Sequence, residues 1–326
     1  MTVAVETRLH HGVLTLDKPA GWTSHDVVAK VRGLLRGDKV GHAGTLDPAA
    51  TGVLPILVGQ ATRIAEYLVE WDKEYRAVLR LGVATDTQDA TGQIVAARPV
   101  PPLSLAQVRE VARRFQGQIA QVPPMYSAVK VAGVPLYRSA RAGKTVERDA
   151  RTVTIHALDV LGLEGADVSL RVHCSKGTYI RTLCADLGDA LGCGGHLLSL
   201  QRSRVGPLTV ERALSLDEVC RLGGQGSLGP QLLALDEMLA DMPCVTVNES
   251  TAARVLHGVG VPWSACGPDL LRRITPGGAR EVRIKDTEGR LLAVGTVVED
   301  ATRGAQSGLD PVGIRIRKVL GGQERD

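Results

Sequence analysis

Apolar and polar residues alternate along two stretches of the chain. From Tyr75 to Val83, and again from Asp167 to Cys174, every second position carries an apolar residue. Successive side chains of a strand point to opposite faces, so both stretches predict strands with one buried face. Apolar runs predict further strands at 13–16, 54–58, 151–163 and 196–205.

Other stretches repeat their apolar residues at the spacing of a helix, and they lie at 24–35, 61–69, 104–115 and 178–191. Ser24, Ser104 and Thr178 stand where three of these helices begin, and each is predicted to cap its helix. Between strands, the turn-forming residues 85–92 include Asp86 and Asp89. Their carboxylates are expected to bond their own backbone.

The chain changes character towards its carboxyl end. Residues 221–231 are rich in glycine and predict a flexible connector. Beyond Met242, short β-like runs alternate with turns, which is typical of a small β-rich domain. We therefore expect two domains, at 1–242 and 243–326.

The composition is that of a folded protein, with 326 residues of which 44% are apolar. The formal net charge is +4, but the segment 130–151 holds six basic residues and only two acidic ones. This segment lies in an irregular basic insertion, predicted at 123–151. Such a cluster fits a phosphate-rich partner, or alternatively a plain solvated surface.

The six cysteines are spaced too widely for a zinc or dithiol motif, so reduced thiols and no metal site are expected. Residues 1–12 lack the apolar core of a signal peptide, and no apolar run approaches the length of a membrane span. These features predict a cytoplasmic protein without membrane attachment.

The stretch Gly41-His42-Ala43-Gly44-Thr45-Leu46-Asp47-Pro48-Ala49-Ala50-Thr51-Gly52 is called the signature loop below. Its glycines permit tight turns and close approach of another molecule. Pro48 biases Asp47 towards an extended conformation, which holds one carboxylate on a stiff loop. Taken alone, the pattern also fits an ordinary turn.

The signature loop resembles that of the bacterial TruB-type tRNA pseudouridine synthases. Five more blocks, at 16–24, 73–76, 85–92, 123–130 and 174–183, resemble this family in the same order. The resemblance implies an α+β catalytic domain with a mixed, mainly antiparallel sheet. It also implies a PUA-like carboxyl-terminal domain, to which 256–260 contributes a weaker match.

The family resemblance implies isomerisation of uridine 55 in the T-loop of tRNA, without a cofactor. It assigns the nucleophile to Asp47, a charge partner to Arg181 and a base-stacking and proton-transfer role to Tyr75. It also implies substrate contacts by His42, Tyr179 and Leu200. RNA backbone contacts are expected from the basic insertion, at Lys130, Arg141, Lys144 and Arg148. Lys18 has two open interpretations, contact with a phosphate or with the signature loop, and receives no role.

Two other functions fit parts of the sequence. A non-catalytic RNA-binding or RNA-folding protein would use the basic insertion and treat the signature loop as structure. A carboxylate hydrolase would pair Asp47 with Asp86 or Asp89. The guide-RNA-dependent branch of the same superfamily is disfavoured, because the chain has no long lysine-rich tail. A stand-alone, monomeric enzyme that acts on the tRNA T stem-loop is the favoured prediction.

Overall fold

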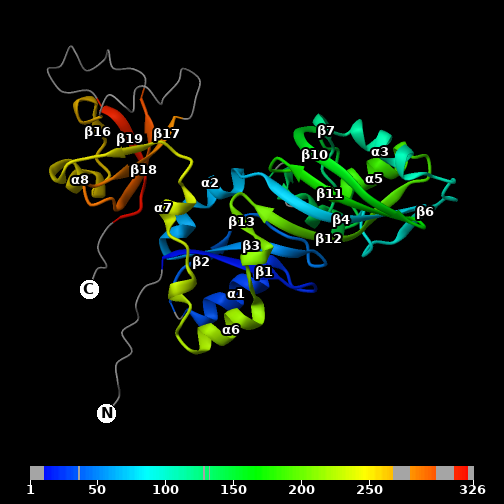
Figure 1. Cartoon of the computed structure of the whole chain (residues 1–326), viewed down its shortest axis with the longest axis horizontal. Helices are drawn as coiled ribbons and strands as arrows, with labels where there is room; N and C mark the ends of the chain where they lie inside the picture. Colours follow the sequence, from blue (N-terminus) through cyan, green and yellow to red (C-terminus); the bar gives the residue numbers. More distant parts are fainter. Residues whose placement is uncertain are drawn as a thin grey trace.

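The computed structural model describes residues 11–35, 37–127, 129–131, 133–266, 280–298 and 312–321. Within these residues, ten strands form one sheet with the order β14-β1-β3-β12-β4-β11-β10-β7, in which β13 pairs with β12 and β2 with β3 (Figure 1). Its strands are β1 (Gly12–Lys18), β2 (Val40–His42), β3 (Thr51–Val58), β4 (Lys73–Leu81), β7 (Gly117–Gln121), β10 (Arg151–Glu164), β11 (Asp167–Cys174), β12 (Gly195–Val205), β13 (Leu208–Thr209) and β14 (Leu214–Ser215).

The sheet is mixed and mainly antiparallel, as predicted. Among the described pairs of this sheet, only β1–β14 and β3–β12 are parallel. The alternating stretches form β4 and β11, in which every second residue is buried. Two short hairpins lie outside this sheet, β5 (Val83–Thr85) with β6 (Ile94–Ala97) and β8 (Lys130–Val131) with β9 (Val134–Pro135).

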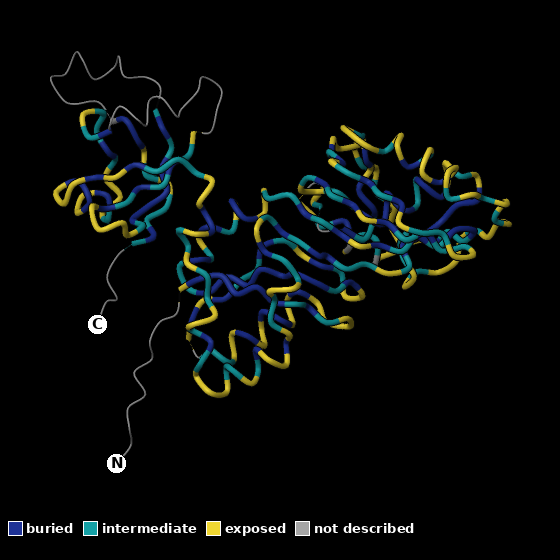
Figure 2. Tube along the Cα trace, viewed as in Figure 1, coloured by how far each residue is buried: buried dark blue, intermediate teal, exposed yellow. Residues whose placement is uncertain are grey.

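Helices pack on the sheet in two groups and divide its core. Helices α1 (Ser24–Leu34) and α6 (Leu216–Gly224) cover β1 and β3. Helices α3 (Leu105–Arg113) and α5 (Ile180–Ala190) cover β4, β10 and β11. Leu200 of β12 packs against both cores, so the two halves of the domain meet at β12. Buried residues follow the strands in Figure 2, whereas exposed residues lie on outer helix faces and loops.

Three sequence expectations about helix ends have different outcomes. Ser104 caps α3, as predicted, with a side chain that accepts from the N–H of Gln107. Ser24 does not cap α1, because Thr23 forms the cap in a reciprocal box with Asp26. Thr178 does not cap α5 either: Tyr179 is the N-cap residue, and the Thr178 hydroxyl donates to the carbonyl of Ser175.

The segments 61–69 and 221–231 also differ from expectation. The first is a 3-10 turn at Gly59–Ile64 followed by α2 (Ala65–Glu70). The glycine-rich segment is no simple connector, because α6 continues to Gly224 and a 3-10 turn covers Gly229–Gln231. A Cβ on Gly223 would lie 2.9 Å from the side chain of Leu34, so this glycine permits close packing of α6 on α1.

The carboxyl-terminal residues form a separate five-stranded sheet, seen at the left of Figure 1. Its order is β15 (Cys244–Thr246), β17 (Glu281–Lys285), β18 (Leu291–Val297), β19 (Val312–Val319) and β16 (Val261–Pro262), with α8 (Glu249–Leu256) packed on it. The predicted small β-rich, PUA-like fold is therefore confirmed. A 3-10 turn at Trp263–Ala265 completes this part. Helix α7 (Leu235–Met238) precedes it in the chain, and another 3-10 turn covers Val210–Arg212.

The second sheet packs against the first part of the chain. Val294 and Leu320 join a core that includes Tyr67, Met238 and Leu239. Asp236 forms an ion pair of 2.7 Å with Arg283 across the same boundary. The division at residue 242 remains a prediction. No helix within the described ranges is long and apolar enough to cross a membrane.

Candidate active site

The signature loop joins β2 to β3 and is fixed from both sides. Ser24 reaches it from α1: its hydroxyl accepts from the N–H of Leu46 at 2.9 Å and donates to the Leu46 carbonyl at 3.2 Å. Lys18 is fully buried, and its ammonium donates to the carbonyl of Pro48 at 3.1 Å and to that of Trp22 at 2.7 Å. Burial lowers the pKa of Lys18 to about 8. Of the two interpretations left open for Lys18, contact with the loop is the one observed.

The loop also depends on two glycines with positive φ. Gly44 has φ +87° and Gly52 has φ +102°, which favour glycine over other residues. At Gly52 there is no room for a side chain either, because a Cβ would lie 2.2 Å from the carbonyl oxygen of Arg202. The N–H of Gly52 donates to Asp17 at 3.1 Å. These contacts hold the short segment that carries Asp47 in one conformation.

Arg181, in the first turn of α5, lies against Asp47. Its Nε is 3.0 Å from Oδ2 of Asp47. The Arg181 side chain is only 6% exposed, whereas 42% of the Asp47 side chain is exposed. The acid therefore stays open to an incoming molecule while its charge partner lies behind it. Burial raises the pKa of Asp47, and the guanidinium of Arg181 opposes that rise.

Backbone carbonyls from two other segments hold the Arg181 guanidinium. It donates to the Thr87 carbonyl at 3.2 Å, in the turn between β5 and β6, and to the Tyr126 carbonyl at 2.8 Å, where the basic insertion begins. Three segments distant in sequence thus converge on one arginine. Its planar fork of donors suits this arrangement.

Asp89 is a second acid beside Arg181, at 3.8 Å from Nε. Its Oδ1 accepts from the Thr91 N–H at 2.9 Å, so the expected bond to its own backbone is confirmed. Asp86 likewise accepts from the N–H of Gln93 at 2.8 Å. The sequence analysis did not predict that Asp89 lies near Arg181. An aspartate in a turn is already accounted for by hydrogen bonds to its own backbone, so its sequence context gives no sign of a further partner. The negative charge of Asp89 contributes to the raised pKa of Asp47.

Gln121 fixes the start of α5. Its side chain accepts from the N–H of Tyr179 at 2.8 Å and donates to the Tyr179 carbonyl at 3.1 Å. Gln121 is buried and ends β7, directly before the basic insertion. The root of the insertion is thereby tied to the turn that carries Arg181, and the half-buried Tyr179 is held beside it.

Tyr75 and Leu200 come from the central strands. Tyr75 lies opposite Arg202 in the β4–β12 register and is 9% exposed. Burial raises its pKa to about 12. Leu200 lines a cavity of about 340 Å³ together with Ala49 and Thr51 of the signature loop, so it lies beside the segment that carries Asp47.

His42 of β2 packs edge-on against His25, with ring centroids 5.5 Å apart. Its Nδ1 is buried and has no hydrogen-bond partner among the described residues. Burial lowers the pKa of His42 to about 4, so this ring is neutral near pH 7. His42 therefore places a neutral ring within the signature loop itself.

The expected phosphate contacts lie on the insertion and not at Asp47. Lys130 is exposed on β8, and Lys144 is exposed in the irregular segment after α4 (Leu136–Arg141). Arg148 is half-buried, and its buried Nε has no partner among the described residues. The side chain of Arg141 lies outside the described part of the structure.

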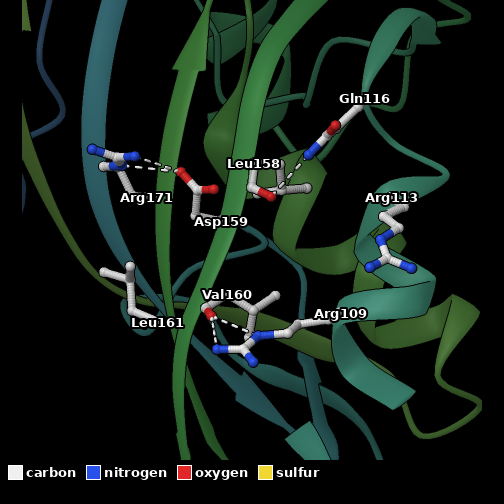
Figure 3. A pocket seen from close by; sticks show the side chains of 8 residues that line it. All are labelled: Arg109, Arg113, Gln116, Leu158, Asp159, Val160, Leu161 and Arg171. Carbon is white, nitrogen blue, oxygen red and sulfur yellow. Dashed lines mark hydrogen bonds and ion pairs between the residues drawn. The ribbon is translucent and has the colours of Figure 1, made fainter. Parts of the chain in front are cut away.

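A cavity of about 500 Å³ lies elsewhere, between α3 and β10 (Figure 3). Its polar groups are engaged: Arg109 donates to the Val160 carbonyl, Gln116 donates to the Leu158 carbonyl, and Arg171 pairs with Asp159. Arg109 and Gln116 thus satisfy carbonyls of β10 beyond the residues that pair with β7. None of the predicted site residues lines this cavity, so we assign no function to it. Among the described residues, no cluster of His, Cys, Asp and Glu has the arrangement of a metal site.

Comparisons with known proteins agree with this arrangement. Residues 32–180 match the model of the TruB family pseudouridylate synthase amino-terminal domain, and residues 181–242 match a tRNA pseudouridylate synthase B carboxyl-terminal domain. The chain is 46% identical to the tRNA pseudouridine synthase B of Burkholderia mallei, over 88% of this chain and 93% of that protein. It is also 46% identical to the enzyme of the same name from Ralstonia pickettii, over 87% and 90% of the two chains.

Solved structures give the same fold. An H/ACA RNP bound to a substrate RNA containing 2'-deoxyuridine aligns with a TM-score of 0.72 and 26% identity, over 98% of this chain and 88% of the other. A Cbf5-Nop10-Gar1 complex aligns with the same TM-score and 29% identity, over 96% and 85%. The fold is thus that of a pseudouridine synthase, and it brings Asp47 and Arg181 together. The chain belongs to the TruB family of pseudouridylate synthases.

Proposed function

We propose that this enzyme isomerises uridine 55 in the T-loop of tRNA to pseudouridine, with Asp47 as the single nucleophile. The observation that carries this proposal is the half-buried carboxylate of Asp47 on the signature loop, paired at 3.0 Å with the buried Arg181 of α5. The relatives of 46% identity bear the name tRNA pseudouridine synthase B, which supports tRNA as the substrate.

The reaction breaks the bond between N1 of uracil and C1' of ribose and forms a bond between C5 and C1'. The proton leaves C5 and the N1 nitrogen gains one, so no atom or electron is exchanged overall. Asp47 attaches to the substrate and is released again, which requires the ionised carboxylate. Arg181 favours that form, because an adjacent cation stabilises the negative charge.

The remaining site residues bind the target nucleotide, line its pocket and stack on its base. An enzyme that modifies a base must first extrude it from its stack, at a cost of a few kcal/mol. Tyr75 lies against the extruded base and assists removal of the C5 proton. Tyr179 and Leu200 line the uridine pocket, and the neutral ring of His42 helps to hold the flipped nucleotide.

The carboxylate-hydrolase alternative is disfavoured by the placement of the acids. Hydrolases of that kind hold two carboxylates across the scissile bond. Here Asp89 accepts bonds within its own turn, and its side chain is only 17% exposed. Asp86 is engaged by the backbone of Gln93.

A direct test uses unmodified tRNA transcript, purified protein and chemical mapping of pseudouridine at single-nucleotide resolution. We expect conversion at position 55 and none in a transcript that carries cytidine there. Conversion at other uridines with uridine 55 unchanged would contradict the T-loop assignment. Tight binding without any conversion would instead support the RNA-folding alternative.

The basic insertion is proposed to clamp the RNA backbone. Lys130→Glu with Lys144→Glu is expected to weaken tRNA binding by about tenfold or more and to flatten its salt dependence, because phosphate contacts release counterions. The matched control, Arg113→Glu with Arg221→Glu, reverses two exposed charges on α3 and α6. Filter binding at several salt concentrations measures both, and equal affinities for the two double variants would argue against the clamp.

The remaining parts of the proposal concern assembly and location. We expect the enzyme to act as a monomer in the cytoplasm, where its tRNA substrate is found. The β-rich residues 243–326 are proposed as a second RNA-binding unit. The higher identity to the bacterial synthases than to the Cbf5-containing complexes supports a stand-alone enzyme over a guide-RNA-dependent one.

A further inference from the structure

Arg202 of β12 is a buried cation that the mechanism above does not use. It is 2% exposed and is among the largest fully buried side chains of the described residues. No carboxylate in the described part of the chain lies within ion-pair distance of its guanidinium. Burying an arginine without a counter-ion is costly, so its charge must be satisfied by other groups.

Those groups are the backbone carbonyls on both sides of Asp47. The guanidinium donates to the carbonyl of Gly44 at 2.9 Å, to that of Thr45 at 3.4 Å and to that of Val53 at 2.8 Å. Gly44 and Thr45 precede Asp47 in the signature loop, and Val53 follows it in β3. One side chain therefore spans the two ends of the segment that carries the nucleophile.

The same arginine contacts Tyr75. The two residues are paired across β12 and β4. Burial raises the pKa of Tyr75, and the neighbouring charge of Arg202 opposes that rise. Within the site, Asp47 and Tyr75 must act on the same extruded nucleotide. Arg202 bonds the loop that carries the first and lies opposite the second in the β4–β12 register.

We propose that Arg202 is a positioning residue that fixes the separation of Asp47 and Tyr75 for the isomerisation. This inference rests on the proposed function, because the separation matters only if both groups act on one nucleotide. The planar fork of arginine is needed, since three carbonyls in different directions must be held at once. Small displacements of reacting groups are known to cost about 10²-fold in rate.

The chain offers a matched control in Lys73. This lysine is also buried, at 6% exposure, and burial lowers its pKa to about 8. Its ammonium donates to the carbonyls of Val69 and Trp71, which lie before β4 and not in the signature loop. Lys73→Met thus removes a buried cation of the same general kind without touching the Asp47 segment.

The test compares full-length wild type, Arg202→Met, Arg202→Lys and Lys73→Met by single-turnover conversion of tRNA transcript at saturating protein. Affinity for tRNA and thermal unfolding are measured in parallel, and rates are compared at equal distance below each melting temperature. We expect Arg202→Met to lose about 10²-fold in rate with unchanged affinity. Lys73→Met is expected to lose stability while its rate stays near that of wild type.

Arg202→Lys keeps the charge and separates positioning from electrostatics. Because an ammonium lacks the fork, we expect it to recover less than about a tenth of the lost rate. Full recovery by lysine, or equal rates for Arg202→Met and Lys73→Met, would overturn the proposal. If Arg202→Met does not fold, the comparison of the single-turnover rates of Arg202→Lys and Lys73→Met tests the positioning role instead. Failure of the proposed function is distinguishable, because the wild type would then convert no tRNA.

Discussion

Asp47→Asn is expected to lower the conversion of uridine to pseudouridine by at least about 10⁴-fold, because an amide cannot serve as the nucleophile. Binding of tRNA is expected to stay within about threefold of wild type, since the substitution preserves the shape of the side chain. Release of tritium from tRNA labelled at C5 of its uridines measures the chemistry, and filter binding measures affinity.

Stability serves as the check that Asp47→Asn leaves the fold intact. A carboxyl whose pKa is raised on folding contributes stability that is present below its unfolded pKa and lost as the pH rises through its folded pKa. At neutral pH the ionised Asp47 therefore does not stabilise the protein, and the asparagine variant should unfold at a similar temperature. Asp86→Asn is the matched control, because Asp86 bonds the Gln93 N–H in the adjoining turn. Equal activity of the two asparagine variants would refute the role of Asp47.

Arg181→Met is expected to lower the single-turnover rate by about 10²–10³-fold, the usual cost of removing a preorganised donor at a reacting charge. It also leaves the carbonyls of Thr87 and Tyr126 without their donor. Arg181→Lys keeps a positive charge but cannot reach Asp47 and both carbonyls together, so an intermediate rate is expected. Rapid-quench measurements at saturating protein determine the rates. A wild-type rate in Arg181→Lys would show that the fork geometry is unimportant.

The regular elements could be predicted from local patterns where one face is buried. The alternating stretches 75–83 and 167–174 form β4 and β11, and the stretch 180–191 with helical apolar spacing forms α5. Helix ends were less predictable, because a hydroxyl near a helix start has several possible partners. The Ser24 hydroxyl is hydrogen-bonded to the backbone of Leu46, and the Thr178 hydroxyl donates to the Ser175 carbonyl. Neither contact can be recognised from a local sequence pattern.

The site could be predicted as far as its motifs extend along the chain. Asp47 and Arg181 were named from the family resemblance, and the structure brings them together across 134 positions. Gln121 and Arg202 were missed because their partners are backbone groups of distant segments, Tyr179 for the first and Gly44 for the second. A charged or amide side chain inside a strand gives no local signal that it will be buried. Only the tertiary structure, which brings the distant segments together, reveals such partners.

The central claim is that Arg181 keeps an otherwise destabilised Asp47 carboxylate ionised for attack. The most direct measurement is the pH dependence of the single-turnover rate in wild type and in Arg181→Met. The rate falls with decreasing pH as Asp47 becomes protonated, and burial places this pKa above the ordinary 3.8. Since Arg181 lowers the pKa of Asp47, its removal is predicted to move the acid limb to higher pH. Acid limbs at the same pH in both proteins would contradict the account.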